Sequence, residues 1–127
     1  MTPSGTFHWF ELVTHDVDAA KSFYQSVLGW QSEKADSGHS PYCLFTKNGV
    51  PVAGVTGVET MLDWPKLDTF PRWIGYVSVD DVDSCVSNAV ASGGRVLKEP
   101  FDVPSIGRIA WIEDPHRGDI GVIKLAA

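Results

Sequence analysis

The four histidines are the side chains best suited to acid–base or metal chemistry at neutral pH, and they are scattered along the chain. No two of them fall at the HxH or HxxxH spacings by which one strand or helix presents two ligands. A histidine without a partner on its own element is usually a solvated side chain rather than a ligand. We therefore expect no metal site built around His8, His15 or His39.

Other catalytic motifs are missing as well. The sequence contains no GxxxxGK, GxGxxG or GxSxG. Cys43 and Cys85 have no CxxC spacing, and we interpret them as small thiols in a reducing compartment. The first six residues lack the apolar core of a signal peptide, so we expect a cytoplasmic protein. A net charge of −6 with only ten Lys and Arg argues against a nucleic-acid or anionic membrane surface.

The elements that must position any site occur as a repeat. Segment 16–20 (DVDAA) opens one helical pattern, and segment 81–85 (DVDSC) opens another 65 residues later. The same offset relates Gly29 to Gly94, which end the two patterns. Each helix has apolar residues at the spacing of one buried stripe. The predicted stripes are Val17, Ala20, Phe23/Tyr24 and Val27/Leu28 in the first helix, and Val82, Cys85/Val86 and Ala89/Val90 in the second.

Each helix is preceded by one predicted strand and followed by three, so each half reads β-α-β-β-β. The predicted strands are 7–14, 30–34, 42–47 and 51–58 in the first half, and 73–79, 95–99, 107–113 and 120–125 in the second. We expect one α+β domain with module one at about 5–58, a connector at 59–71 and module two at 72–127. Side by side, the modules would form a curved, eight-stranded mixed sheet, an incomplete barrel with its helices outside and a cleft on the concave face.

A repeated βαβββ unit with D-V-D-A-A-x-x-F-Y-x-x-V-L-G-W after its first strand resembles the vicinal oxygen chelate superfamily, and within it a glyoxalase-like subgroup. The superfamily includes glyoxalase I, bleomycin-resistance proteins, fosfomycin-resistance enzymes and extradiol dioxygenases. The matching residues extend over nearly the whole chain: Asp16, Ala20, Phe23, Tyr24, Leu28, Gly29, Trp30, Asp80 to Asp83, Gly93, Gly94, Asp114 and Pro115.

The resemblance implies a place for a divalent metal, with ligands on the first and fourth strands of each module. The first-strand ligand of the superfamily lies seven residues before the Asp that caps the helix, which gives Trp9 and Ile74 here (16 − 7 = 9; 81 − 7 = 74). Neither side chain binds metals. The fourth strands, 51–55 and 120–123, contain no His, Cys, Asp or Glu. We therefore expect no metal and no other cofactor.

Strand alternation places Glu11 on the same face as Trp9, and Tyr76 on the same face as Ile74. We expect the cleft to be lined by Trp9, Glu11, Ile74, Tyr76 and Trp111, with His116 in a turn at its rim. Glu11 is then the candidate catalytic base or the partner of a cationic or hydroxyl-bearing ligand. The alternative is a structural role, in which Glu11 binds a neighbouring strand or an arginine. Aromatic walls suit flat or apolar ligands, although some of these rings are expected to fill the core.

These observations favour a metal-independent protein that binds a small, aromatic or cationic molecule, by analogy with the bleomycin-resistance branch. An enzyme of the lyase, isomerase or dioxygenase type, using Glu11 or a different set of metal ligands, is the alternative. A small interaction module with a vestigial cleft is the third possibility. The resemblance also implies a homodimer.

Overall fold

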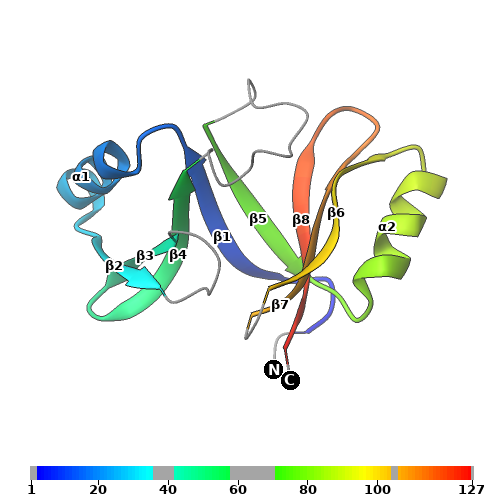
Figure 1. The fold of residues 1–127 in the computed structure, drawn as a ribbon, viewed down its shortest axis with the longest axis horizontal. Helices are drawn as coiled ribbons and strands as arrows, with labels where there is room; N and C mark the ends of the chain where they lie inside the picture. Colours follow the sequence, from blue (N-terminus) through cyan, green and yellow to red (C-terminus); the bar gives the residue numbers. More distant parts are fainter. Residues whose placement is uncertain (1–2, 36–41, 58–70, 104–105, 127) are drawn as a thin grey trace. The chain divides into compact units, whose positions relative to one another are not determined.

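The computed structural model describes residues 3–35, 42–57, 71–103 and 106–126. These residues form two helices and eight strands in the predicted order, βαβββ twice (Figure 1). Residues 59–70 of the predicted connector lie outside the described residues. The elements are β1 (Phe7–Thr14), α1 (Val17–Leu28), β2 (Gln31–Ala35), β3 (Tyr42–Lys47), β4 (Val50–Gly57), β5 (Arg72–Ser78), α2 (Val82–Ala91), β6 (Arg95–Val103), β7 (Gly107–Glu113) and β8 (Asp119–Leu125).

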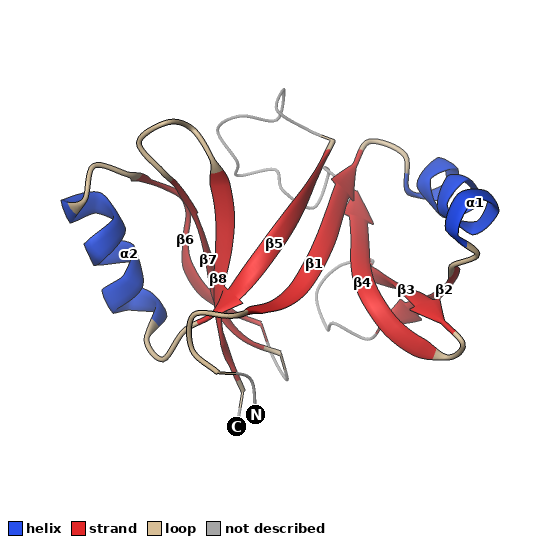
Figure 2. Ribbon diagram, turned by 180° about the vertical axis from the view of Figure 1, so that it is seen from behind, coloured by secondary structure: helices blue, strands red, loops and turns tan. Residues whose placement is uncertain are grey.

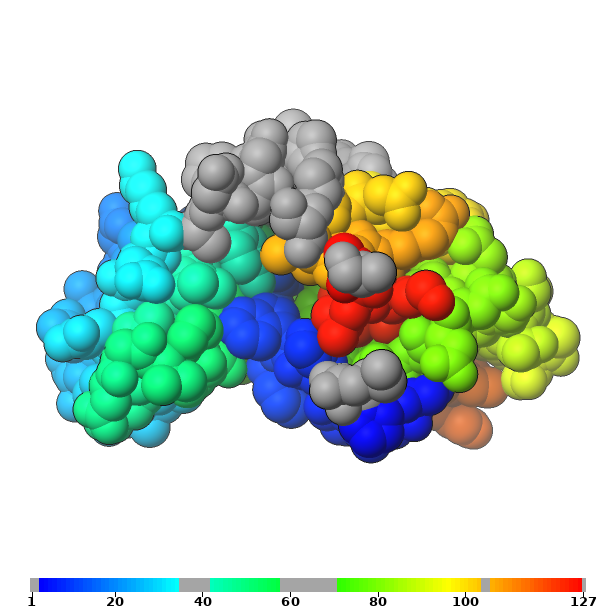
Figure 3. Space-filling view, turned by 90° about the horizontal axis from the view of Figure 1, so that it is seen from below, coloured from blue at the N-terminus to red at the C-terminus, as the bar shows by residue number. Residues whose placement is uncertain are grey.

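The strands are hydrogen-bonded in the order β2-β3-β4-β1-β5-β8-β7-β6, with parallel pairs β1/β4 and β5/β8 and antiparallel hairpins outside them. The sheet is mixed and not closed, which confirms the predicted α+β class. The chain divides into two compact units, one of Trp9–Trp73 and one of Ile74–Ala127 together with Met1–His8. In the latter unit, the N-terminal residues and β8 appear on one face (blue and red in Figure 3), and Ser78 exchanges backbone hydrogen bonds with Gly5 and Thr6.

Both helices begin at the predicted aspartates. The Asp16 carboxylate accepts a hydrogen bond from the backbone N–H of Ala19 at 2.9 Å, and Asp81 accepts one from Ser84 at 3.1 Å. Gly29 ends α1 in the left-handed region at φ 72°, where a glycine carries no Cβ penalty. Neither helix has a stretch long and apolar enough to cross a bilayer.

The predicted buried stripes are correct only in part. In α1, Val17, Ala20 and Tyr24 pack on the core, but Phe23, Val27 and Leu28 have exposed fractions of 57%, 58% and 46%. In α2, Val82 and Val86 are buried, whereas Val90 is exposed. In each helix, the stripe of side chains that packs on the sheet is therefore narrower than the stripe of apolar residues in the sequence. An apolar surface remains on α1 near its C-terminal end.

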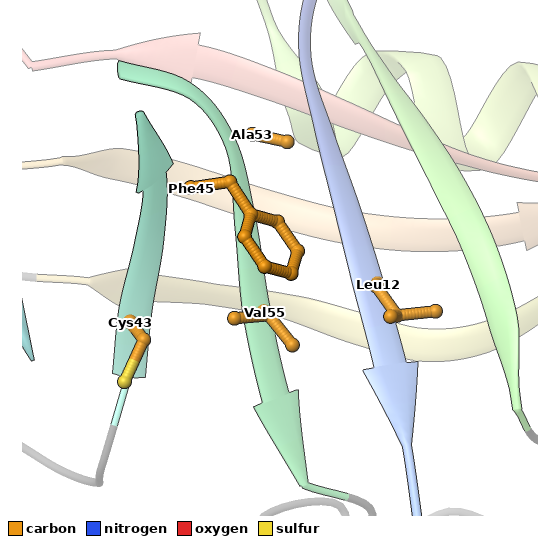
Figure 4. Packing of buried hydrophobic residues seen from close by; sticks show 5 residues of the cluster. All are labelled: Leu12, Cys43, Phe45, Ala53 and Val55. Atoms are coloured by element: carbon orange, nitrogen blue, oxygen red, sulfur yellow. The ribbon is translucent and has the colours of Figure 1, made fainter. Parts of the chain in front are cut away.

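The helices cover one face of the sheet in each unit (Figure 2). Beneath α1, a cluster from β1, β3 and β4 fills the core: Leu12, Cys43, Phe45, Ala53 and Val55 (Figure 4). Beneath α2, Val82 and Val86 pack on Ala110 of β7 and Val122 of β8. Because side chains alternate along a strand, Trp9, Glu11 and Val13 face away from the α1 core.

The strand β6 runs four residues beyond its predicted end at 99, through Pro100 to Val103. Proline cannot donate a ladder hydrogen bond, which is why it marks a strand end in sequence analysis. Here β6 is the last strand in the order, and its register with β7 shifts between Lys98 and Phe101. An edge strand with an irregular register accommodates the proline.

On the face of the sheet opposite α1, a tyrosine and a tryptophan are hydrogen-bonded to each other across the fourth strand of the module. The strand β4 lies between β3 and β1. Tyr42 is the first residue of β3. Its hydroxyl accepts a hydrogen bond from the indole N–H of Trp9 on β1 at 3.0 Å. A Cβ atom added to Gly54 of β4 would overlap the Tyr42 ring and hydroxyl. Gly54 therefore leaves the space that the ring occupies.

The other unit repeats this arrangement with the two aromatic residues exchanged between strands. Tyr76 belongs to β5, the first strand of the module, and Trp111 belongs to β7, the third strand. The Tyr76 hydroxyl accepts a hydrogen bond from the Trp111 indole N–H at 2.8 Å. Gly121 lies opposite both residues in the register of β8, and a Cβ there would overlap the Tyr76 ring. Each unit thus has one Trp–Tyr bridge over a fourth-strand glycine.

We expect Gly54→Ala to lower the free energy of unfolding by about 1–3 kcal/mol, because the methyl group must displace the Tyr42 ring from a packed position. Denaturant unfolding measures the change. In a Tyr42→Ala background, the same substitution should cost much less, since the ring is no longer there. An equal cost in both backgrounds would contradict the contact.

Candidate functional site

The residues most suited to ligand recognition in the unit Trp9–Trp73 are Trp9, Glu11 and Tyr42. Trp9 and Glu11 are two residues apart on β1 and share a face of the strand. Glu11 is paired with Gly54 in the β1/β4 register, directly beneath the Tyr42 ring. The Glu11 side chain is hydrogen-bonded to Tyr42, so all three residues are linked. The two predicted site residues of this unit therefore lie in one cluster, as strand alternation implied.

The hydrogen bonds in this cluster have a defined direction. The indole N–H of Trp9 donates to the Tyr42 oxygen, and a protonated Tyr42 hydroxyl donates to the Glu11 carboxylate. Burial and, second, the negative charge of Glu11 raise the pKa of the Tyr42 hydroxyl well above its ordinary value. Tyr42 therefore keeps its proton at physiological pH. Hydrogen bonds arranged in series, with an ionised group at the end, strengthen one another.

This arrangement determines what each group can offer a ligand. The only polar hydrogen of the Trp9 indole is already donated, so the half-buried ring presents its π faces and edges. Glu11 is only 7% exposed, and a carboxylate accepts hydrogen bonds through both of its oxygens. A buried carboxylate beside an aromatic face suits a cation or a strong hydrogen-bond donor on an apolar body.

The other predicted site residues belong to the second unit. Ile74 and Trp111 are 1% and 2% exposed, and Tyr76 is 4% exposed. The Trp111 indole N–H donates to the Tyr76 hydroxyl, and the two rings pack edge to face. Within the unit these three residues are buried side chains, and their place along a ligand cleft remains a prediction. Where Glu11 stands in module one, the 65-residue offset gives Tyr76, so the second unit has no matching carboxylate at this position.

His116 lies exposed in the turn between β7 and β8. The Asp114 carboxylate accepts hydrogen bonds from the backbone N–H groups of His116 and Gly118 and orders this turn. The Gly118 bond, followed by the His116 bond, holds the pKa of Asp114 below its ordinary value. A rim position for His116 remains a prediction.

Metal-binding groups do not converge in the part of the chain that the structure describes. There, no group of three or more His, Cys, Asp or Glu side chains is placed to hold an ion. The buried Glu113 of β7 is engaged by Arg95, at 2.9 Å between Oε1 and Nη2. His39 lies outside the described residues. Whether this protein acts without a metal is a prediction to be tested.

Tyr42 is the site residue that sequence reasoning missed. It begins a predicted strand and belongs to no motif, so its type alone gave no reason to select it. The available signal was Gly54 in the middle of β4, since a glycine inside a strand often marks a close approach by another group. Another aromatic residue of this unit, Trp73 at the start of β5, lies near the α1 core. It contacts the rings of Tyr24, Trp30 and Phe45 and donates to the Tyr24 hydroxyl at 3.1 Å.

Comparison with solved structures supports the fold. Methylmalonyl-CoA epimerase from Streptomyces coelicolor, in complex with 2-nitronate-propionyl-CoA, superposes with a TM-score of 0.62 over 98% of this chain and 97% of the epimerase, at 20% identity. The enzyme from Mycobacterium tuberculosis gives 0.58 over 100% and 93% of the two chains, at 19% identity. At this identity the likeness shows a shared fold and nothing about the reaction.

Other known proteins are more similar to this chain in sequence than these two enzymes are. CFP32 of Mycobacterium tuberculosis, whose name assigns it provisionally to the glyoxylases, is 36% identical over 93% of this chain and 45% of its own length. The anthracycline biosynthesis protein DauV of Streptomyces sp. strain C5 is 36% identical over 95% of this chain and 42% of its own. The chain thus spans less than half the length of these relatives. Residues 6–37 match the family described as bleomycin resistance protein-like N-terminal. Together with the repeated βαβββ fold, these matches show that the chain belongs to the vicinal oxygen chelate superfamily.

Proposed function

We propose that this protein binds a small aromatic or cationic molecule at Trp9 and Glu11 without the help of a metal ion. The observation that supports this most directly is the hydrogen-bonded series Trp9–Tyr42–Glu11. It combines an aromatic face that has no free polar hydrogen with a buried carboxylate. The net charge of −6 also attracts a cation over long range.

The Trp–Tyr bridges support the proposal that binding needs no metal ion. Superfamily enzymes take metal ligands from the first and fourth strands, and here those positions hold Trp9, Ile74 and apolar residues. The Tyr42 and Tyr76 rings also cover the fourth strands at Gly54 and Gly121. A chain with these substitutions retains the fold and recognises its ligand through rings and one carboxylate.

A pair of matched probes tests the proposed function. Phenyltrimethylammonium and its neutral isostere tert-butylbenzene have nearly the same shape, so their affinity ratio isolates the charge. Titration of the purified protein, followed by tryptophan fluorescence, should give saturable quenching with the cation and weaker binding of the neutral compound. Glu11→Gln should reduce the preference for the cation by about tenfold, because it removes the buried negative charge at constant shape.

Glu113→Gln is the matched control, since it neutralises another buried carboxylate that is already engaged by Arg95. It should leave the affinity ratio unchanged. Metal analysis of the same preparation completes the test. A stoichiometric, tightly held divalent metal would refute metal-independent binding and favour the enzymatic alternative, and an absence of saturable binding would refute the site.

We further propose that the protein forms a homodimer in the cytoplasm. The exposed apolar surface of Phe23, Val27 and Leu28 on α1 supports a contact between copies. Both cysteines are free thiols, as expected for a reducing compartment.

Sedimentation equilibrium tests the homodimer. Replacement of Val27 and Leu28 by Glu should convert dimers to monomers, because two charges would then be buried at the contact. Gln25→Glu, a charge change at an exposed position of the same helix, is the control. A wild-type chain that is monomeric at every concentration would contradict the proposal.

A further inference from the structure

One side of α1 carries large apolar side chains that the core of its unit does not bury. Phe23 and Val27 lie one helical turn apart on the same side of the helix, and both are exposed. The Phe23 ring packs edge to face on Tyr24, with the ring centroids 5.0 Å apart. Trp73 of β5 extends this surface, because it is 39% exposed and its indole N–H donates to the Tyr24 hydroxyl at 3.1 Å. We call these four residues the Phe23–Trp73 surface.

The internal repeat indicates that the fold itself does not require these side chains. The 65-residue offset pairs Phe23 with Asn88 and Val27 with Ser92. All four positions are exposed, yet α2 carries polar residues there and α1 carries apolar ones. Both helices begin at a capping aspartate and cover their strands. The apolar side chains of α1 therefore point to a contact outside the core of the chain.

The charge distribution favours a second copy of the chain as the partner. Residues 22–32 contain no Asp, Glu, Lys or Arg, although 20% of the chain is charged. Because the net charge is −6, two copies repel each other where acidic residues meet and approach with the least repulsion at an uncharged surface. A basic partner would instead gain from acidic residues at the contact. The cores of protein interfaces are depleted of charge and enriched in aromatic residues, as this surface is.

We propose that two copies of the chain meet at the Phe23–Trp73 surface, with Trp73 as the anchor of the contact. Tryptophan and tyrosine are enriched among the residues that dominate binding free energy at interfaces. The hydrogen bond to Tyr24 holds the Trp73 ring before association, so little side-chain freedom is lost on binding. This inference rests on the proposed homodimer and adds the residues that hold the copies together.

The repeat also sets the number of copies. Because α2 carries Asn88 and Ser92 at the equivalent positions, it does not offer a second surface of this kind. A contact between the same surface on two copies is isologous, with a two-fold axis between them. Such a contact uses the one surface of each copy and leaves none for a third. The assembly therefore closes as a dimer.

Replacement of surface residues by their α2 counterparts tests this contact. The variant Phe23→Asn with Val27→Ser carries side chains that the same helix positions accept in α2. Sedimentation equilibrium should show that the dissociation constant of the dimer rises about 100-fold, because the apolar contact is lost. Circular dichroism checks that the variant is folded. Val90→Asn is the matched control, since it removes an exposed apolar side chain from α2, and it should leave the dissociation constant unchanged.

Trp73 reports on the same contact in the wild-type protein. Its emission should move to shorter wavelength as the protein concentration rises through the dissociation constant, because the dimer buries a ring that is partly exposed in one chain. Trp73→Phe should raise the dissociation constant about tenfold. It should also lack the shift at concentrations where it still dimerises.

The outcomes separate this contact from the homodimer on which it rests. If the wild type is monomeric at every concentration, the homodimer is wrong. If the wild type dimerises but the Phe23→Asn, Val27→Ser variant keeps the same dissociation constant, the homodimer stands and its contact lies elsewhere. A wild-type emission that does not change with concentration would mean the same. Assemblies larger than a dimer would overturn the two-fold closure.

Discussion

The packing of both units depends on one kind of contact, in which a tyrosine ring lies over a glycine of the fourth strand and is held there by a tryptophan N–H. In each unit the fourth strand is flanked by the first and third, so a side chain that joins these two must cross it. A Cβ at the crossing point would block the ring, and only glycine leaves room. Gly54 and Gly121 are therefore part of the arrangement that fixes Tyr42 and Tyr76.

The two bridges make the units similar in packing and different in chemistry. The Trp111 indole N–H donates to the Tyr76 hydroxyl, and the nearly complete burial of both side chains is the usual condition of core aromatic residues. Tyr42 serves two partners, since it accepts from Trp9 and donates to Glu11. A buried carboxylate is costly unless hydrogen bonds compensate it, so Glu11 and Tyr42 depend on each other. The first strand of one unit thus carries a buried carboxylate, Glu11, where the first strand of the other carries Tyr76.

Most of the fold was predictable because its signals are local. The capping aspartates Asp16 and Asp81, the stop at Gly29 and the strand alternation around Glu11 each act within a few residues. The exposed side chains of Phe23 and Val27 were not predictable, because the width of the buried stripe depends on how closely α1 approaches its strands. Tyr42 was missed for a similar reason. Its role comes from partners 33 and 31 residues away in sequence (42 − 9 = 33; 42 − 11 = 31), which no local pattern contains.

The ionisation of the Tyr42 hydroxyl reports on this contact without any ligand, and the chain has only three tyrosines to resolve. An alkaline titration followed by the ultraviolet absorbance of tyrosinate, with Tyr42→Phe as the reference, isolates this hydroxyl. Because folding raises its pKa, Tyr42 should stabilise the protein below the ordinary tyrosine pKa of about 10 and lose that contribution as the pH rises further. We predict that Tyr42 ionises only when the protein unfolds at high pH. Ionisation near the ordinary value in a protein that is still folded would show that the hydroxyl is not buried against Glu11, and would contradict the account.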